Sequence, residues 1–223
     1  MRHLIMLLAL ALALMPLVAL AQDDPEEEAD ELAADFDIIT TEDERYRLAL
    51  PIGWAVVPSE TTLALTNRGD IAEMLEDDDF EAAPEDLEAG DFVLTVFFFP
   101  EDFLRVLDID AEALDEVVLG FTQVLRISDD DPAEEADMLQ ADNDFEVGRV
   151  VLPPNPETDE QNIVYGFPLT VDAEADQVLY TMAILSVLAD QGLDALADLE
   201  DELLIVFSTL EYIGDWDDLA EGL

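Results

Sequence analysis

The stretch Tyr46–Trp54 (YRLALPIGW) decides the fold of this chain. Apolar side chains alternate with others along Tyr46–Leu50, which predicts a strand with one buried face. Pro51–Gly53 supplies turn residues, and Trp54–Val57 returns to a strand-like composition. The pattern therefore predicts a β-hairpin, with Trp54 as the apolar plug of its core.

Further strands are predicted where short apolar runs lie between turn residues. These runs are Thr62–Thr66, Phe92–Phe99, Phe145–Leu152, Asn162–Val171 and Gln177–Ser186. Phe92–Phe99 is apolar except for Thr95, so we expect a central strand that is covered on both faces and ends at Pro100. The Phe97–Phe99 run is expected to be core rather than the lining of a pocket.

Two amphipathic helices are predicted, together with a shorter helical segment at Ile71–Leu75. Ala111–Arg126 is the clearest helix, because its apolar residues recur with helical spacing on one face. That face comprises Leu114, Val117, Val118, Phe121, Val124 and Leu125. Gly192 precedes the second amphipathic helix, Leu193–Phe207, which places Leu196, Leu199, Leu203 and Phe207 on one face.

The order of strands, helix, strands, helix indicates the fold class. It predicts an α+β domain with a mostly antiparallel sheet and helices packed on it. Hairpin-like links between the late strands also favour antiparallel pairing. We expect a single domain over residues 36–213, which is an ordinary domain size.

Two stretches of the chain resemble a known family. The Pro-x-Gly-Trp opening at Tyr46–Trp54, and the helix ending in Ser-Thr-Leu at Leu203–Leu210 after the strand Val178–Ser186, resemble the PsbP-like and DcrB-like α/β/α sandwich superfamily. The match covers about Phe36–Tyr212 in the order of its elements. The resemblance implies a fold rather than a reaction, because such relatives are photosystem accessory subunits, small binding adaptors or uncharacterised secreted proteins.

The chain is extremely acidic, with 57 Asp+Glu against 7 Lys+Arg in 223 residues and a formal net charge of −50. All seven cations are arginines, and there is no cysteine. The composition excludes disulfides and thiol chemistry, and it excludes nucleic-acid binding through a basic face, which needs Lys and Arg. Repulsion at this charge density is tolerable only when salt screens it, so we predict a salt-stabilised fold.

The N-terminus has the three parts of a secretory signal peptide over residues 1–21. A basic start is followed by the apolar run Leu4–Leu20 and by small residues at Ala19 and Ala21. No cysteine follows, so a lipoprotein anchor is excluded. We expect a secreted protein, extracellular or periplasmic, with no membrane insertion after cleavage. Acidic residues then form a disordered leader at 22–35, and a second acidic tail covers 214–223.

Cleavage would remove His3, the only histidine, so the mature chain lacks Ser-His-Asp and Cys-His machinery. A Ser-Lys dyad is excluded because the chain has no lysine. Two kinds of carboxylate chemistry remain. A Ca²⁺-dependent binding module is the first alternative to a non-enzymatic binding domain, since hard cations take oxygen ligands. A hydrolase with paired carboxylates is the second alternative, but 57 acids produce close pairs by chance and such an enzyme also needs a deep cleft.

The weak Ca²⁺ candidates are Asp129, Asp130, Asp131, Asp142 and Asp144. Asp142–Glu146 resembles the opening of an EF-hand loop, but Val147 stands at the glycine position and Pro153 where the bidentate Glu should be. A third acidic run covers Glu76–Asp79. We expect a diffusely screened acidic surface rather than a defined site, and therefore no cofactor.

Six arginines lie beyond the signal peptide: Arg45, Arg47, Arg68, Arg105, Arg126 and Arg149. They would bind an anion if they clustered, but each is expected to form a surface salt bridge instead. The sequence thus predicts a secreted, highly acidic, non-enzymatic binding or accessory domain. Its partner, a protein or a small ligand, is not specified by any motif.

Overall fold

The computed structural model describes residues 35–59, 62–76, 87–107, 109, 113–125, 135–141, 144–155, 159–172, 177–189 and 192–214. All the elements below belong to the unit Phe36–Leu223. The signal peptide, residues 22–34 of the leader and the tail beyond Gly214 lie outside the described residues.

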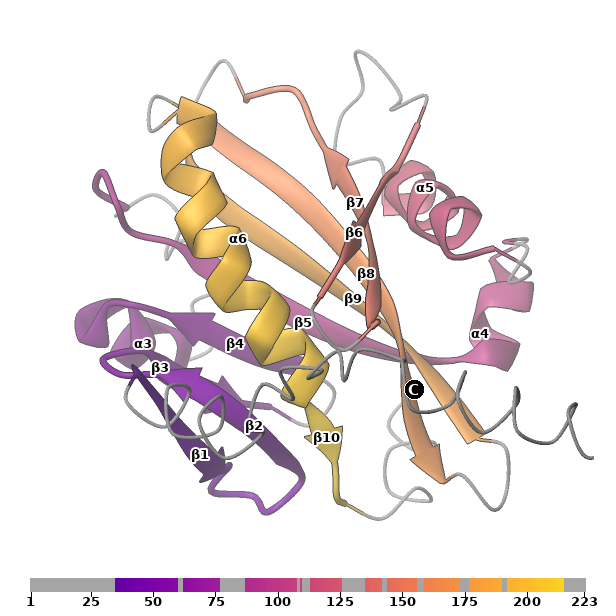
Figure 1. Cartoon of the computed structure of the whole chain (residues 1–223), viewed down its shortest axis with the longest axis horizontal. Coiled ribbons are helices and arrows are strands. Elements are labelled where there is room, and N and C mark those ends of the chain that lie inside the picture. Colours follow the sequence, from indigo (N-terminus) through magenta and orange to yellow (C-terminus); the bar gives the residue numbers. More distant parts are fainter. Residues whose placement is uncertain are drawn as a thin grey trace, which may run out of the picture. The chain divides into compact units, whose positions relative to one another are not determined.

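The described part of the chain is an α+β fold, as predicted (Figure 1). Its strands are β1 (Phe36–Thr40), β2 (Tyr46–Pro51), β3 (Ala55–Pro58), β4 (Thr62–Thr66), β5 (Val93–Pro100), β6 (Asp137–Gln140), β7 (Glu146–Val151), β8 (Glu160–Asp172), β9 (Gln177–Leu188) and β10 (Glu211–Tyr212). Its helices are α3 (Gly69–Glu76), α4 (Glu101–Val106), α5 (Leu114–Leu125) and α6 (Gly192–Thr209).

The strands form two sheets. The larger sheet has seven strands in the order β3-β4-β5-β9-β8-β7-β6, and the smaller has three in the order β1-β2-β10. Every pairing in both sheets is antiparallel, including the late strands β6 to β9. Among the described residues, β3 and β6 are the edges of the large sheet, and β1 is an edge of the small one.

One face of the large sheet carries α6 and the small sheet. Alternate side chains of its central strands, such as Phe98, Tyr165 and Leu185, point to this side and are fully buried. Leu203 and Phe207 of α6 pack against them, which confirms the predicted apolar face of this helix. The largest apolar cluster therefore lies between the sheet and α6.

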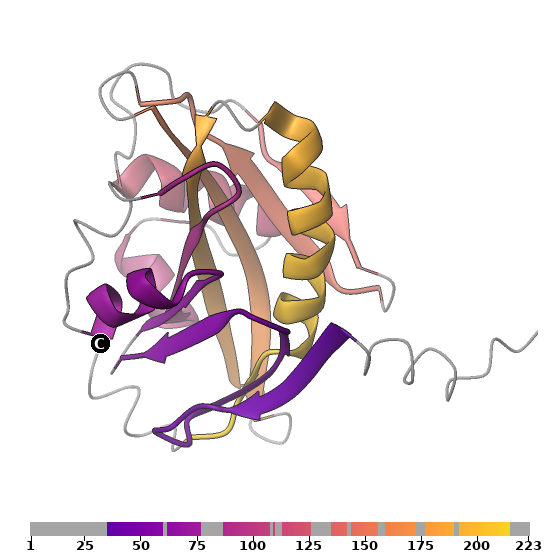
Figure 2. The ribbon, with the colours of Figure 1, turned by 90° about the vertical axis from the view of Figure 1, so that its left-hand side faces the viewer.

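The opposite face carries α3, α4 and α5, so helices cover the sheet on both sides (Figure 2). Val117, Val118 and Phe121 of α5 are buried there against β7, β8 and β9. α3 covers β3 and β4 with Ile71 and Leu75. The described residues thus form an α/β/α sandwich.

The predicted hairpin at Pro51–Gly53 is wrong in its pairing. The turn forms, with the Trp54 amide donating to the Pro51 carbonyl at 3.1 Å, but β2 belongs to the small sheet and β3 to the large one. Gly53 has a φ of 96°, and a positive φ at this turn position is typical of a type II turn, which splays the flanking strands. The stretch is a corner between two sheets.

Three smaller predictions need correction. Val124 is 44% exposed, because it lies in the last turn of α5. In the phenylalanine run Phe98 is fully buried, and Phe99 on the opposite face of β5 is half-buried but packs against the core beneath α5, so only Phe97 departs from the expected core. Gly192 does not precede the second amphipathic helix but is its first residue.

Candidate functional site

A groove of about 620 Å³ lies between the two sheets, where the end of β1 faces β3. One wall is Ile39–Glu42, from the end of β1 and the turn that follows it. The other wall is Val56–Ser59, from β3 and the residue after it, and Leu75 and Glu76 of α3 close one end. This volume falls in the range of pockets that hold small organic ligands.

The groove exists because the chain turns a corner at Pro51–Trp54. That corner sends β2 into the small sheet and β3 into the large one, so β1 and β3 each keep one side without a strand among the described residues. Val57 and Leu75 are buried against the core and support the groove from below. Because the chain changes sheets at this corner, the edge of β1 and the edge of β3 lie on opposite sides of the groove.

The groove is lined by both apolar and polar residues, with acidic residues at its borders. Ile39, Val56 and Leu75 contribute hydrocarbon surface, and Glu42 and Glu76 are exposed carboxylates. Thr41 is buried, and its hydroxyl is committed to the turn, where it donates to Asp43 Oδ1 at 2.6 Å. The arrangement suits a ligand with apolar and cationic parts.

The calcium candidates were expected on three acidic runs, and most of these residues lie outside the described part of the chain. This holds for Asp129, Asp130, Asp131 and Asp142, and also for 77–79 of the third run. Asp144 is described, in the turn between β6 and β7, with a φ of 62° and with Gln140 donating to it at 3.2 Å. Among the described residues, no three acidic side chains gather into a metal-binding group.

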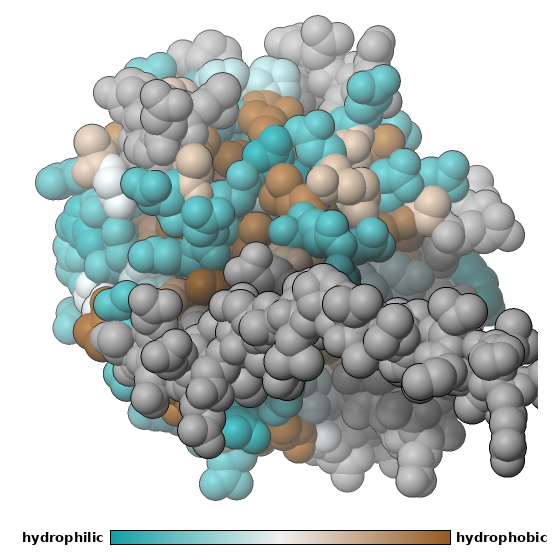
Figure 3. All heavy atoms as spheres, in the orientation of Figure 1, coloured by the Kyte–Doolittle hydropathy of each residue, from teal (hydrophilic) through white to brown (hydrophobic). Residues whose placement is uncertain are grey.

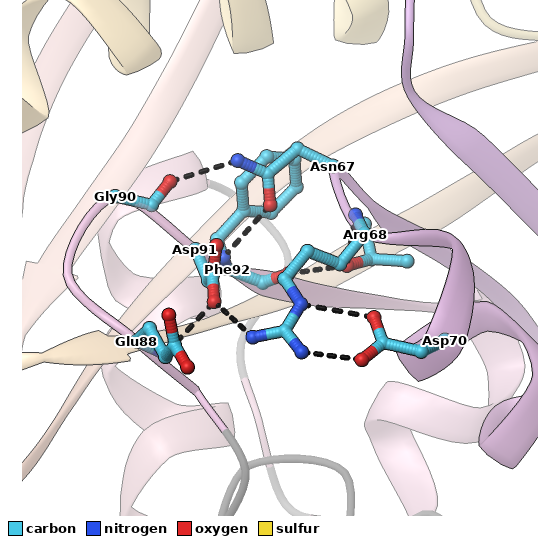
Figure 4. A network of polar contacts seen from close by, with 8 residues as sticks. Asn67, Arg68, Asp70, Glu88, Gly90, Asp91 and Phe92 are labelled. Carbon is cyan, nitrogen blue, oxygen red and sulfur yellow. Dashed lines mark hydrogen bonds and ion pairs between the residues drawn. The ribbon is translucent and has the colours of Figure 1, made fainter.

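The arginines whose pairings are described contact carboxylates, and among them none gather into an anion site. Arg68 is hydrogen-bonded to Asp70 through two nitrogens and donates to Asp91 Oδ2 at 2.7 Å (Figure 4). The hydrogen bond from Arg68 lowers the pKa of the Asp70 carboxyl. Asn67 joins the same network by donating to the Gly90 carbonyl at 2.8 Å. The network ties the start of α3 to the segment that leads into β5.

A second arginine network fastens α6 to the sheet. Arg149 of β7 donates to both carboxylate oxygens of Glu200, at 3.0 and 2.8 Å, and to Asp137 Oδ2 at 2.7 Å. Tyr165 donates to Glu200 Oε1 at 3.0 Å. Burial and the Glu200 carboxylate both raise the pKa of Tyr165, so its hydroxyl remains protonated.

Two further arginines form ion pairs with carboxylates, as the sequence predicted. Arg45 lies 3.8 Å from Asp43, and Arg47 lies 3.7 Å from Glu211. Arg126 lies outside the described residues.

On the face shown in Figure 3, hydrophilic residues cover most of the described surface, and apolar residues form small patches between them. Within the described ranges, no helix combines the length and the hydropathy needed to cross a membrane.

Sequence reasoning missed the strand that forms one wall of the groove. Apolar and polar residues do not alternate clearly along Phe36–Thr40 (FDIIT). The one available signal was the β-branched run Ile38–Thr41, because β-branched residues favour strands. The groove itself has no sequence signal, because it depends on β2 and β3 parting at the corner.

Comparisons with known proteins find solved structures of low sequence identity. No protein-family model and no curated protein matches the chain. Among solved structures, it is similar to cyanobacterial PsbP (CyanoP) from Synechocystis sp. PCC 6803, with 15% identity over 80% of this chain and 93% of that chain and a TM-score of 0.42. It is also similar to LpqN, involved in cell envelope biogenesis of Mycobacterium tuberculosis, with 9% identity over 82% and 95% and a TM-score of 0.42.

At these identities and TM-scores the likeness carries no inference about the family or the function of this chain.

Proposed function

We propose that this chain is a secreted, acidic, non-enzymatic binding or accessory domain that contacts its partner through the groove between β1 and β3. The observation that carries the proposal is the groove itself, with a lining of apolar and polar residues, two acidic borders and a strand edge on each side. Pockets of this size with a few placed polar groups are the usual sites of ligand recognition.

The chemistry of the side chains supports binding rather than catalysis. The chain has no cysteine and no lysine, and its single histidine, His3, lies in the predicted signal peptide. A carboxylic acid that donates a proton near neutral pH needs a raised pKa. The pKa of Asp70 moves the opposite way because of its hydrogen bond with Arg68, and that network holds α3 in place.

Secretion is the second part of the proposal and has a direct test. The full chain, carrying a C-terminal tag, would be expressed in a bacterium and recovered from the medium or the periplasm, and its mass would be measured. We expect a chain that begins at Gln22. A full-length chain held in the membrane would contradict the proposal.

The groove is tested by photo-crosslinking in the cells that make this protein. A photo-reactive phenylalanine at Thr40, in the groove wall, is compared with the same residue at Met138, on the edge strand β6. Both positions are exposed on edge strands, so Met138 serves as the control for adducts with random neighbours. We expect one defined adduct at Thr40 only. No adduct, or the same adducts at both positions, would overturn the groove as the contact surface.

A further inference from the structure

The hydrogen-bond phase of β1 shows which of its backbone groups face away from β2. The Thr41 amide donates to the Tyr46 carbonyl at 2.9 Å, so this pair is a hydrogen-bonded one. Such pairs alternate along an antiparallel ladder, and the register Ile39↔Leu48 continues the same phase. Ile38 and Thr40 therefore point their N–H and C=O groups to the free edge. In agreement, the amide of Ala49, opposite Ile38, donates to Thr209 on the other side of β2.

The same reasoning applies to β3. The Ser59 amide donates to the Thr62 carbonyl at 2.9 Å, and the register continues with Val57↔Ala64 as the next hydrogen-bonded pair. Val56 therefore directs its N–H and C=O groups away from β4, and Pro58 directs its carbonyl the same way. The groove is thus bordered by outward backbone donors and acceptors from two different sheets.

The charge of the molecule restricts what can occupy this space. Glu42 and Glu76 are exposed at the borders of the groove, in a chain with a formal net charge of −50. A second copy of the chain would bring the same charge and would be repelled. A segment with Lys or Arg would be attracted to the carboxylates and gain electrostatic complementarity.

We propose that the groove takes an extended, basic peptide segment of a partner protein, which adds as a strand between β1 and β3. The segment's backbone pairs with Ile38 and Thr40 on one side and with Val56 and Pro58 on the other. Its β-branched side chains contact Ile39 and Val56, and its flanking cations approach Glu42 and Glu76. This inference rests on the proposed binding function and specifies both the class of partner and the mode of recognition, which is β-strand addition.

The probe is a capped heptapeptide in which valine and threonine alternate between terminal lysines. Its affinity for the mature chain is measured by fluorescence anisotropy at a salt concentration that keeps the protein folded. The first control is the same peptide with glutamate in place of lysine. The second control carries N-methyl groups on alternate residues, which removes backbone donors without changing charge. We expect the lysine peptide to bind, the glutamate peptide not to bind, and N-methylation to weaken binding by about tenfold or more.

The protein variants remove single outward amides. Thr40→Pro and Val56→Pro delete donors on the free edges and leave the hydrogen-bonded pairs of each ladder intact. Met138→Pro is the matched control, since Met138 is the corresponding outward residue on β6, the opposite edge of the large sheet. We expect T40P and V56P each to weaken binding by about threefold to tenfold, and M138P to leave it unchanged. Circular dichroism confirms that each variant is folded.

The outcomes distinguish failure of the strand-addition inference from failure of the proposed binding function. If the lysine peptide binds but N-methylation has no effect, or if M138P weakens binding as much as T40P, strand addition is overturned while acidic binding stands. If the lysine peptide does not bind, the inference is overturned, and the proposed function still depends on the crosslink at Thr40. Dimers of the mature chain that T40P abolishes would identify a second copy as the occupant and would also overturn the inference. If V56P does not fold, T40P and the N-methylated peptide still decide.

Discussion

At the scale of single residues, Thr181 places a hydroxyl group without a hydrogen-bond partner in the core of the described residues. Its side chain is fully buried in β9, opposite Phe98 on one side and Phe167 on the other. Its hydroxyl has no hydrogen-bond partner among the described residues. An unpaired hydroxyl in an apolar core costs about 1–3 kcal/mol. We expect Thr181→Val, which keeps the shape, to raise the free energy of unfolding by about 1 kcal/mol in urea denaturation.

Thr66 provides the matched control for that substitution. It is equally buried, but its hydroxyl donates to the Phe92 carbonyl at 2.8 Å and accepts from the Arg68 amide at 3.2 Å. Thr66→Val removes both bonds and should lower the free energy of unfolding by about 1–3 kcal/mol. Effects of the same sign at the two positions would contradict the assignment of Thr181 as unpaired.

Asp70 gives a prediction about pH. The hydrogen bond from Arg68 lowers the pKa of Asp70 below the ordinary value of 3.8. A group with a lowered pKa in the folded state contributes stability above its unfolded pKa, and this stability is lost as the pH falls through the folded pKa. We expect Asp70→Asn to lower the melting temperature near pH 7 and to have little effect near pH 2. The melting temperatures of Asp70→Asn and of the unsubstituted chain are compared in about 1 M salt, because long-range charge repulsion is then screened. An equal effect at both pH values would exclude the Arg68–Asp70 pair as the cause.

At the scale of elements, a pair of glycines determines how closely α5 approaches the sheet. Gly148 of β7 and Gly166 of β8 are opposite one another in register. A Cβ at Gly148 would lie 2.8 Å from Val118 Cγ2, and a Cβ at Gly166 would meet the same methyl group and lie 2.9 Å from Met182 Sδ. Val118 therefore occupies the space that two side chains would otherwise fill.

Gly166→Ala should overpack this contact and lower the free energy of unfolding by about 1–3 kcal/mol. Val118→Ala in the same chain removes the methyl groups that a Cβ would meet. The double variant should therefore be less destabilised than the sum of the two single variants, as a double-mutant cycle would show. Strict additivity would mean that Gly166 and Val118 do not limit each other.

α6 depends on a charged contact as well as on its apolar face. Glu200→Ala would leave Tyr165 without its hydrogen bond and Arg149 with only Asp137, and the Glu200 side chain is 17% exposed. We expect a loss of about 2–3 kcal/mol in the free energy of unfolding, because partly buried groups lose their partner. Glu211→Ala breaks only the exposed ion pair with Arg47, and should cost less than about 1 kcal/mol. Equal effects would show that the Glu200 network is as solvent-screened as the surface pair.

The same elements show what sequence can and cannot predict. Strands with a clear apolar pattern, such as β4 and β5, and the helices α5 and α6 were predicted close to their observed bounds, because burial imposes their periodicity. β1, β6 and α4 were missed, since short elements at the edge of a fold carry little periodic signal. The groove was not predictable, because Pro51–Gly53 signals a turn but does not show whether the flanking strands pair, and it is the geometry of that turn that sends β2 and β3 into different sheets.

At the scale of the whole molecule, charge is the dominant property. A formal net charge of −50 favours the unfolded chain, in which like charges are farther apart. The Debye length falls from about 30 Å at 0.01 M salt to about 10 Å at 0.1 M, so screening relieves most of this repulsion in ordinary salt. We expect the melting temperature of the mature chain to rise steeply with NaCl at low concentration and then to level off. A melting temperature that is flat or falls with NaCl would contradict the salt-stabilised fold.

Calcium separates general screening from a defined cation site. CaCl₂ and NaCl are compared at matched ionic strength, with a chelator added at the end of each series. A surface that is only screened gives similar curves for the two salts, whereas a ligand bound to the folded state adds stability that depends on its concentration relative to Kd. Because Asp142–Glu146 departs from the EF-hand pattern at the glycine position and at the bidentate Glu, we expect curves that coincide. A large extra rise in calcium, reversed by the chelator, would place a metal site in the acidic runs, and it would make the calcium-dependent module the better account of this protein.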